Sequence, residues 1–168
     1  MINSVLRYTL IFILLMLLQI LVFDNIQISG YINPYIYVMF ILILPFEIPS
    51  WLLLLISFAA GFIMDLFSGT PGMHSAATVL AGFVRPYILS INSPRDGYDQ
   101  HTSPSLSTYG LRWFAIYTVL IVLIHHTTLF YLEVFRFEDF FRTMLRVIAS
   151  SSLTIIFILL IEFYRRGK

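Results

Sequence analysis

The residues best suited to chemistry in this sequence stand in one short stretch, FIMDLFSGTPGMHSA, from Phe62 to Ala76. Asp65 ends a long apolar run, and His74 follows it after two glycines and a proline. Ionisable residues beside apolar runs often mark binding sites when the run lies in a membrane. One interpretation is therefore that Asp65 and His74 face a cavity and bind something polar.

The same stretch also has a structural interpretation, which we favour. Gly69 and Gly72 allow the backbone conformations of a tight hairpin between two helices. The unpaired N–H groups at the start of the second helix, near His74, then point back toward Asp65 and stabilise its carboxylate. Asp65 is thus expected to pin the two helices together.

Arg85 and Pro86 lie near the end of this second helix. We expect the pair to end the helix at the membrane surface, where the long Arg85 side chain reaches the lipid headgroups. A pairing of Arg85 with Glu47 is the other interpretation.

His125, His126 and Glu133 resemble metal ligands at first sight. Adjacent histidines diverge by ~100° around a helix, and no H-E-x-x-H motif is present. We therefore expect no metal site, and instead a polar seam in which His126 and Glu133 share one helix face. No nucleophile elbow, phosphate-binding glycine loop or paired carboxylates are recognisable, so the sequence predicts neither an enzyme nor a cofactor.

These residues lie in a strongly apolar chain. Of its 168 residues, 59% are hydrophobic and 11% charged, and it has no cysteine. Soluble domains carry ~25% charged residues, so the chain is predicted to be a membrane protein. A net charge of +1 predicts no nucleic-acid partner.

The apolar segments predict an all-α fold, a polytopic bundle of six transmembrane helices in one domain. The predicted spans are residues 8–23, 32–46, 51–67, 74–91, 111–135 and 141–164, with a cytoplasmic loop over 92–110. The second and third are short for a ~30 Å hydrocarbon core, and the fourth could be a span or a re-entrant segment.

Basic residues predict the orientation. Most lie on the side of the termini, namely Arg7, Arg85, Arg95, Arg112, Arg165, Arg166 and Lys168, against Arg136, Arg142 and Arg146 on the other side. The positive-inside rule places both termini in the cytoplasm. Small residues such as Ser57, Gly61, Ala77 and Gly82 predict close helix packing within the chain, with a docking groove for another protein's helix as the alternative.

Residues 30–89 resemble the MreD family of rod shape-determining membrane proteins, and look most like its Bacteroidetes members. The resemblance lies in NPYIYV, the LPFEIP corner, the GFIMDLFSGTPGMH stretch and the FVRP ending. It implies a non-enzymatic subunit of the bacterial cell-elongation complex in the cell inner membrane. Such a subunit binds the single-span protein MreC and, through it, connects MreB filaments with RodA and a class B penicillin-binding protein.

MreD is also similar in fold to the S-component of vitamin transporters, six helices around an outward-facing pocket. That similarity implies a cavity for a lipid or small ligand near Asp65 and His74, but a fold does not establish a function. Three classes stay open at this point: a scaffold subunit, a ligand-binding transporter component, and a membrane enzyme acting on lipid-linked substrates. We rank them in that order.

Overall fold

The protein is built from helices, as the sequence predicts. The computed structural model describes residues 2–26, 32–99, 102–135 and 140–166, and these contain helices and loops without a strand. In chain order the elements are α1 (Ile2–Leu21), the 3₁₀ turns η1 (Phe23–Asn25) and η2 (Ile36–Val38), α2 (Met39–Ile43), α3 (Ser50–Ser68), α4 (Met73–Ile91), α5 (Leu106–Val134) and α6 (Phe140–Arg166).

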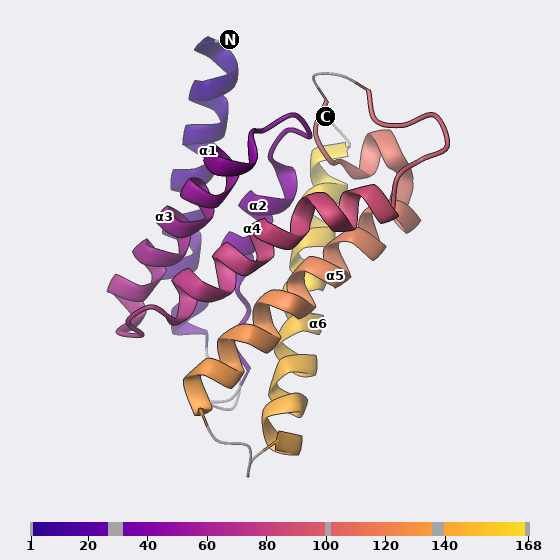
Figure 1. Ribbon diagram of the computed structural model, residues 1–168. Helices are drawn as coiled ribbons and strands as arrows, with labels where there is room; N and C mark the ends of the chain where they lie inside the picture. The colour runs from indigo at the N-terminus through magenta and orange to yellow at the C-terminus, as the bar shows by residue number, and fades with distance from the viewer. Residues whose placement is uncertain (1, 27–31, 100–101, 136–139, 167–168) are drawn as a thin grey trace.

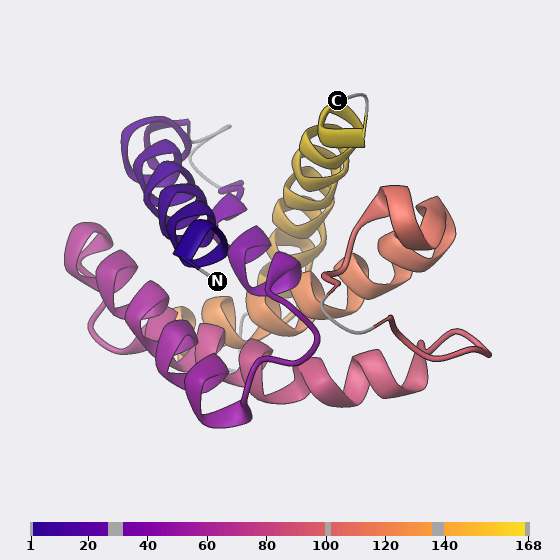
Figure 2. The same ribbon diagram turned by 90° about the horizontal axis from the view of Figure 1, so that it is seen from above.

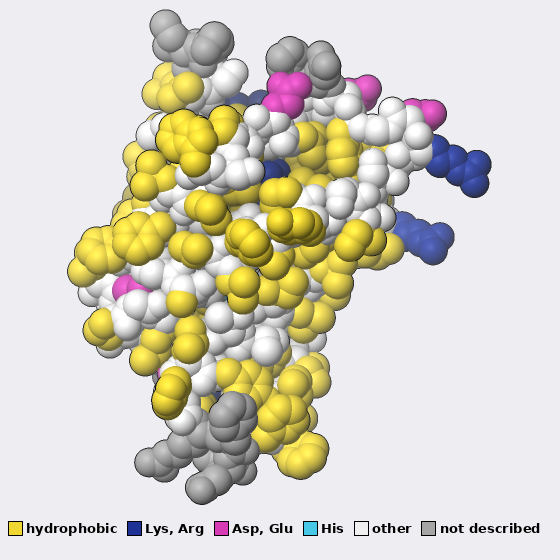
Figure 3. Space-filling view, viewed as in Figure 1, with side chains coloured by type: hydrophobic (Ala, Val, Ile, Leu, Met, Phe, Trp, Pro, Cys, Tyr) yellow, Lys and Arg dark blue, Asp and Glu magenta, His cyan; other side chains and the backbone are white. Residues whose placement is uncertain are grey.

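Four of the helices, α1, α3, α5 and α6, are long and apolar enough to cross a membrane. The start of α1 and the end of α6 lie at the same end of the molecule, which we call the terminal end (Figure 1). Helices α3 to α6 pack in sequence order, each against the next, and α2 lies in the middle of the bundle when it is viewed from above (Figure 2). Hydrophobic side chains are spread over the face drawn in Figure 3, and few charged side chains stand among them. The chain is a helical membrane protein.

The prediction of a spanning helix over residues 32–46 is wrong. Helix α2 has only five residues and follows a 3₁₀ turn, while Asn33 to Tyr35 precede them without helical structure. Extended backbone rises ~3.3 Å per residue against 1.5 Å in a helix, so this mixed segment covers roughly 30 Å where a helix would cover ~22 Å. The segment therefore traverses the molecule in fewer residues than a helix needs.

We call residues 33–45 the crossing segment. Its residues 35–44 are all buried, from 0% to 7% exposed. Buried backbone outside a helix must find partners elsewhere, since lipid offers none. Five side chains supply them. Gln19 is hydrogen-bonded to the backbone of Pro34, Ile36 and Tyr37. The Ser150 and Thr154 hydroxyls accept from the backbone N–H groups of Asn33 and Tyr35. At the other end, Tyr117 donates to the Leu42 carbonyl, and Arg85 donates to the Leu44 and Pro45 carbonyls.

Helices α3 and α4 approach each other closely through small residues. A Cβ atom on Gly61 would lie 2.5 Å from the backbone oxygen of His74, so only glycine fits there. A Cβ atom on Gly82 would collide with the Ser57 side chain, which would have to shift. The small-residue faces pack within the chain, so that prediction is confirmed.

The loop after α4 is shorter than predicted. Part of it is exposed, as predicted, and part of it packs against the helices. A first turn of α5 begins at Leu106, and the helix axis breaks at Gly110, where φ is +80°. Phe46 stacks on Tyr98 with 4.1 Å between ring centroids, and the Trp113 indole donates to the Asn92 carbonyl at 2.6 Å. These aromatic contacts hold the loop against the corner between α2 and α3.

Candidate functional site

Asp65 holds the α3–α4 hairpin as the sequence predicts. One carboxylate oxygen accepts from the His74 backbone N–H at 2.9 Å, and the other accepts from the Ser75 N–H at 3.0 Å and hydroxyl at 2.6 Å. The Thr70 hydroxyl donates at 3.2 Å. Gly69 and Gly72 both have positive φ, of +66° and +82°, which the turn requires. The carboxylate thus satisfies the free N–H groups at the start of α4.

The substitution Asp65→Asn is expected to destabilise the protein by about 2 kcal/mol. An amide has one acceptor oxygen, so at least one group at the start of α4 is left buried without a partner, and the favourable charge at the helix N-terminus is lost. The measurement is the thermal unfolding midpoint of the purified protein in detergent. Asp96→Asn, in the exposed part of the loop after α4, is the matched control; equal midpoints for the two variants would contradict the hairpin role.

Next to the hairpin, the Tyr37 hydroxyl is the centre of a buried polar network. Its oxygen lies 3.0 Å from His74 Nδ1, 3.0 Å from the Thr78 hydroxyl and 2.7 Å from His125 Nε2. All four side chains are at most 1% exposed. The network joins the crossing segment to α4 and α5.

The network continues from His125 to His126. The two Nδ1 atoms lie 3.5 Å apart, and His126 Nε2 lies 3.0 Å from the Thr154 hydroxyl oxygen. The hydroxyl of Thr154 donates to the Ser150 carbonyl and that of Thr78 to the His74 carbonyl, so both hydroxyl oxygens are acceptors within the network. Tyr37 can therefore donate its proton to Thr78 or to a histidine ring, which leaves the tautomer of His74 open.

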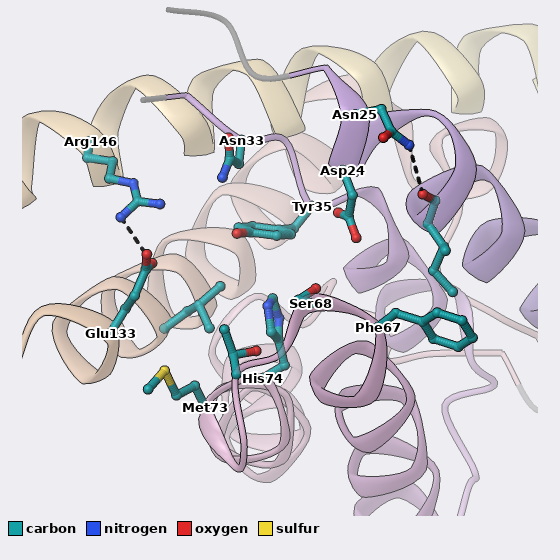
Figure 4. A pocket seen from close by; sticks show the side chains of 13 residues that line it. Asp24, Asn25, Asn33, Tyr35, Phe67, Ser68, Met73, His74, Glu133 and Arg146 are labelled. Carbon is teal, nitrogen blue, oxygen red and sulfur yellow. Dashed lines mark hydrogen bonds and ion pairs between the residues drawn. The ribbon is translucent and has the colours of Figure 1, made fainter. Parts of the chain in front are cut away.

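His74 also borders a polar cavity of about 510 Å³ (Figure 4). The polar cavity lies at the end of the molecule opposite the termini, among the ends of α1, α3 and α5 and the starts of α4 and α6. Its lining residues are Ile20, Asp24, Asn25, Asn33, Tyr35, Phe67, Ser68, Thr70, Met73, His74, Leu129, Glu133 and Arg146. Its volume is in the range of small-molecule sites.

Charged groups stand on opposite walls of this cavity. Glu133 and Arg146 form an ion pair of 3.0 Å on one wall, and the Arg146 guanidinium lies 4.3 Å from the Phe130 ring centroid. Asp24 stands on the other wall (Figure 4). One of its oxygens accepts from the Gln19 side-chain amide at 2.7 Å. The predicted seam through His126 and Glu133 is only partly formed, because His126 is buried and Glu133 lies at the exposed cavity wall.

Arg85 does not reach the membrane surface, and that prediction is wrong. Its side chain is 1% exposed, and it donates to the Leu44 and Pro45 carbonyls and, at 2.9 Å, to the Tyr117 hydroxyl. Pro86 does not end α4 either, since the helix continues to Ile91. Pro86 thus lies inside the helix, where a proline removes one backbone hydrogen bond.

The structure therefore divides the predicted site residues between two places. Asp65, Gly69, Gly72 and His74 meet at the hairpin beside the polar cavity, while Arg85 and Pro86 lie 11 residues or more further along α4, ~16 Å away. Sequence reasoning missed Gln19, Asp24, Asn33 and Tyr37, and the only available signal was a polar residue inside or beside an apolar run. Among the described residues, no group of three or more His, Asp or Glu side chains is placed to hold a metal ion.

Comparison of the chain with known protein families, with curated proteins and with solved structures found no match in any of the three.

Proposed function

We propose that the protein is a non-enzymatic subunit of the MreD kind in the bacterial cell-elongation complex. In this role it lies in the cell inner membrane with both termini in the cytoplasm and binds the single-span protein MreC. Through MreC it connects with MreB, RodA and a class B penicillin-binding protein. The residues that carry the resemblance to MreD are the starting point for this proposal.

The observation that most supports a binding role is that the stretches resembling MreD are held in place by hydrogen bonds within the bundle. The backbone of the NPYIYV stretch is held by Gln19, Ser150 and Thr154, and the LPFEIP corner is held by Arg85. Asp65 closes the hairpin of the third stretch. These polar groups are engaged in shaping the bundle, which fits a protein that works by presenting a surface.

An apolar groove of about 630 Å³ is the surface on which we expect a helical partner to bind. Helices α1 and α3 form its walls and the segment around α2 its floor, toward the terminal end. Its lining is Ser4, Val5, Tyr8, Thr9, Phe12, Phe40, Leu44, Pro45, Glu47, Ile48, Pro49, Leu52, Ile56 and Ala59. Small residues on both walls let another helix approach closely. Glu47 at its cytoplasmic mouth suits the basic residues that flank single spans on that side.

Filling this groove is expected to weaken partner binding. Ala59→Phe adds a ring to the groove wall, and we expect about a tenfold loss of co-purified MreC, equivalent to ~1.4 kcal/mol. Ala76→Phe, at an exposed position of α4 outside the groove, is the matched control. The measurement is quantitative co-purification of the tagged protein with its partner; equal recovery with both variants would contradict the groove as the partner site.

Depletion of the protein, followed by microscopy and by co-purification from the same cells, tests the proposed function as a whole. The expected result is conversion of rods to spheres together with loss of a co-purifying single-span partner. Unchanged cell shape after depletion would contradict it.

A ligand-binding transport subunit similar to an S-component is the second candidate, and the polar cavity favours it. This role predicts a tightly bound molecule, visible by mass spectrometry of the purified protein, and impaired vitamin uptake after depletion with unchanged cell shape. The two roles are therefore distinguished by the same depleted cells.

A further inference from the structure

The Asp24 carboxylate is the charged acceptor on one wall of the polar cavity. It accepts from the Gln19 side-chain amide and has Ser68 as a second hydrogen-bond partner, beside it in Figure 4. A carboxylate has about four acceptor sites, so Asp24 can accept further hydrogen bonds from a ligand in the cavity.

His74 can add a second acceptor. When Tyr37 donates its proton to Thr78, the Nδ1–H of His74 donates to the Tyr37 oxygen and Nε2 is left as an acceptor. Nε2 has no partner within the described part of the chain, and His74 borders the cavity. The open tautomer of His74 thus lets the cavity accept from a ligand that only donates.

Charge and aromatic rings point to a cation. Two carboxylates, Asp24 and Glu133, line the cavity against one guanidinium, and Glu133 is already paired with Arg146. The rings of Tyr35 and Phe67 border the same space, and aromatic faces attract cations. The described lining therefore has an excess of negative charge centred on Asp24.

The position of the cavity suits an amphiphile. It opens where α1 and α3 end, which is the depth of lipid headgroups when these helices span the membrane. Leu66 and Phe67 are 66% and 65% exposed beside it. Acyl chains can lie along this part of α3 while a headgroup enters the cavity.

We propose that the polar cavity binds a primary ammonium group, with Asp24 as its counter-ion and His74 as a further acceptor. The group is carried either by a lipid headgroup, as in phosphatidylethanolamine, or by a free amine. This site goes beyond the proposed scaffold role, which requires no ligand in the polar cavity. Its test uses the purified chain without a protein partner, so the two can fail separately.

The experiment measures thermal unfolding in detergent with added dioleoyl lipids and records retained lipid by native mass spectrometry. Phosphatidylethanolamine at ~100 times its Kd is expected to raise the midpoint by ~5–10 °C. Phosphatidylcholine, whose quaternary ammonium has no N–H, and phosphatidylglycerol are expected to raise it much less. Equal effects of the three lipids would overturn the proposal.

Variants locate the effect in the cavity. Asp24→Asn keeps an oxygen for Gln19 but removes the charge, and is expected to lose the shift and the retained phosphatidylethanolamine, whereas Asp96→Asn keeps both. Phe67→Leu, at an exposed position, serves as a second variant and should bind more weakly. An undiminished shift in Asp24→Asn would overturn the proposal.

Two further readouts separate the sources and the geometry. If O-phosphoethanolamine reproduces the stabilisation, the free headgroup chemistry suffices; if only the lipid stabilises, the ligand is the lipid. With imidazole ¹⁵N labelling, the chain has four histidines to assign, and the ligand is expected to shift His74 to its Nδ1–H form. A His74 ring that stays in the Nε2–H form with ligand bound would contradict its role as an acceptor.

Discussion

Gln19→Leu is expected to lower the thermal unfolding midpoint by about 10 °C. The Gln19 side-chain oxygen accepts from the Ile36 N–H at 2.7 Å and the Tyr37 N–H at 3.4 Å, and its amide donates to the Pro34 carbonyl at 3.1 Å. Leucine leaves these buried backbone groups without partners at ~1–3 kcal/mol each. A combined loss of ~3–5 kcal/mol corresponds to a shift of this size in a chain of this length.

The control for this variant is Thr9→Val on the same helix. Its hydroxyl donates only to the Val5 carbonyl within α1, at an exposed position, so the midpoint should fall by little. If Gln19→Leu is as stable as Thr9→Val, the crossing segment does not depend on Gln19.

The second large effect is expected for Arg85→Met, which should destabilise the protein by about 3 kcal/mol. Methionine fills much of the space but leaves the Leu44 and Pro45 carbonyls and the Tyr117 hydroxyl without the guanidinium. Arg112→Met, at an exposed position of α5, is the matched control and should be nearly neutral. The measurement is again the unfolding midpoint in detergent.

Arg85→Lys distinguishes a buried role from a surface role. An ammonium is a compact group that cannot reproduce the fork of a guanidinium, so lysine should lose more than half of the stabilisation if Arg85 holds the corner. If Arg85 instead extended to the headgroups, lysine would serve equally well. A fully stable Arg85→Lys variant would therefore contradict the contacts described above.

The α3–α4 hairpin was predictable because its signals are local. Asp65 and the His74 N–H that it accepts from are nine residues apart, and the glycines and the proline between them indicate a turn. The long helices were predictable for a similar reason, since continuous apolar runs of their length have few other stable forms in a membrane.

The crossing segment was not predictable from its own residues. A short apolar run is compatible with a helix or with a buried irregular segment, and periodicity does not separate the two. The conformation depends on hydrogen-bond partners for the backbone, which other parts of the chain provide. Ser150 and Thr154 lie 117 and 119 residues after Asn33 and Tyr35, whose N–H groups they accept from. A single glutamine within the apolar run of α1 gave no sign of its four contacts.

The site was predicted in part for the same reasons. The sequence placed Asp65 beside the start of α4 and His74 near it, but the other walls of the polar cavity come from α1, η1, the crossing segment, α5 and α6. Arg85 was misplaced because the Arg-Pro pair resembles a helix end at a membrane surface. Its real partners, the Leu44 and Pro45 carbonyls, are about 40 residues earlier in the chain and belong to the segment whose form was missed.

The most direct test of this account is the side of the membrane from which single cysteines are labelled. The chain has no cysteine of its own, so Ser4→Cys, Asn25→Cys and Ser50→Cys can be compared one at a time with a membrane-impermeant thiol reagent. If residues 33–45 cross the membrane inside the bundle, positions 4 and 50 are labelled from one face and position 25 from the other. Labelling of positions 25 and 50 from the same face would contradict the crossing and the arrangement of the polar groups that depends on it.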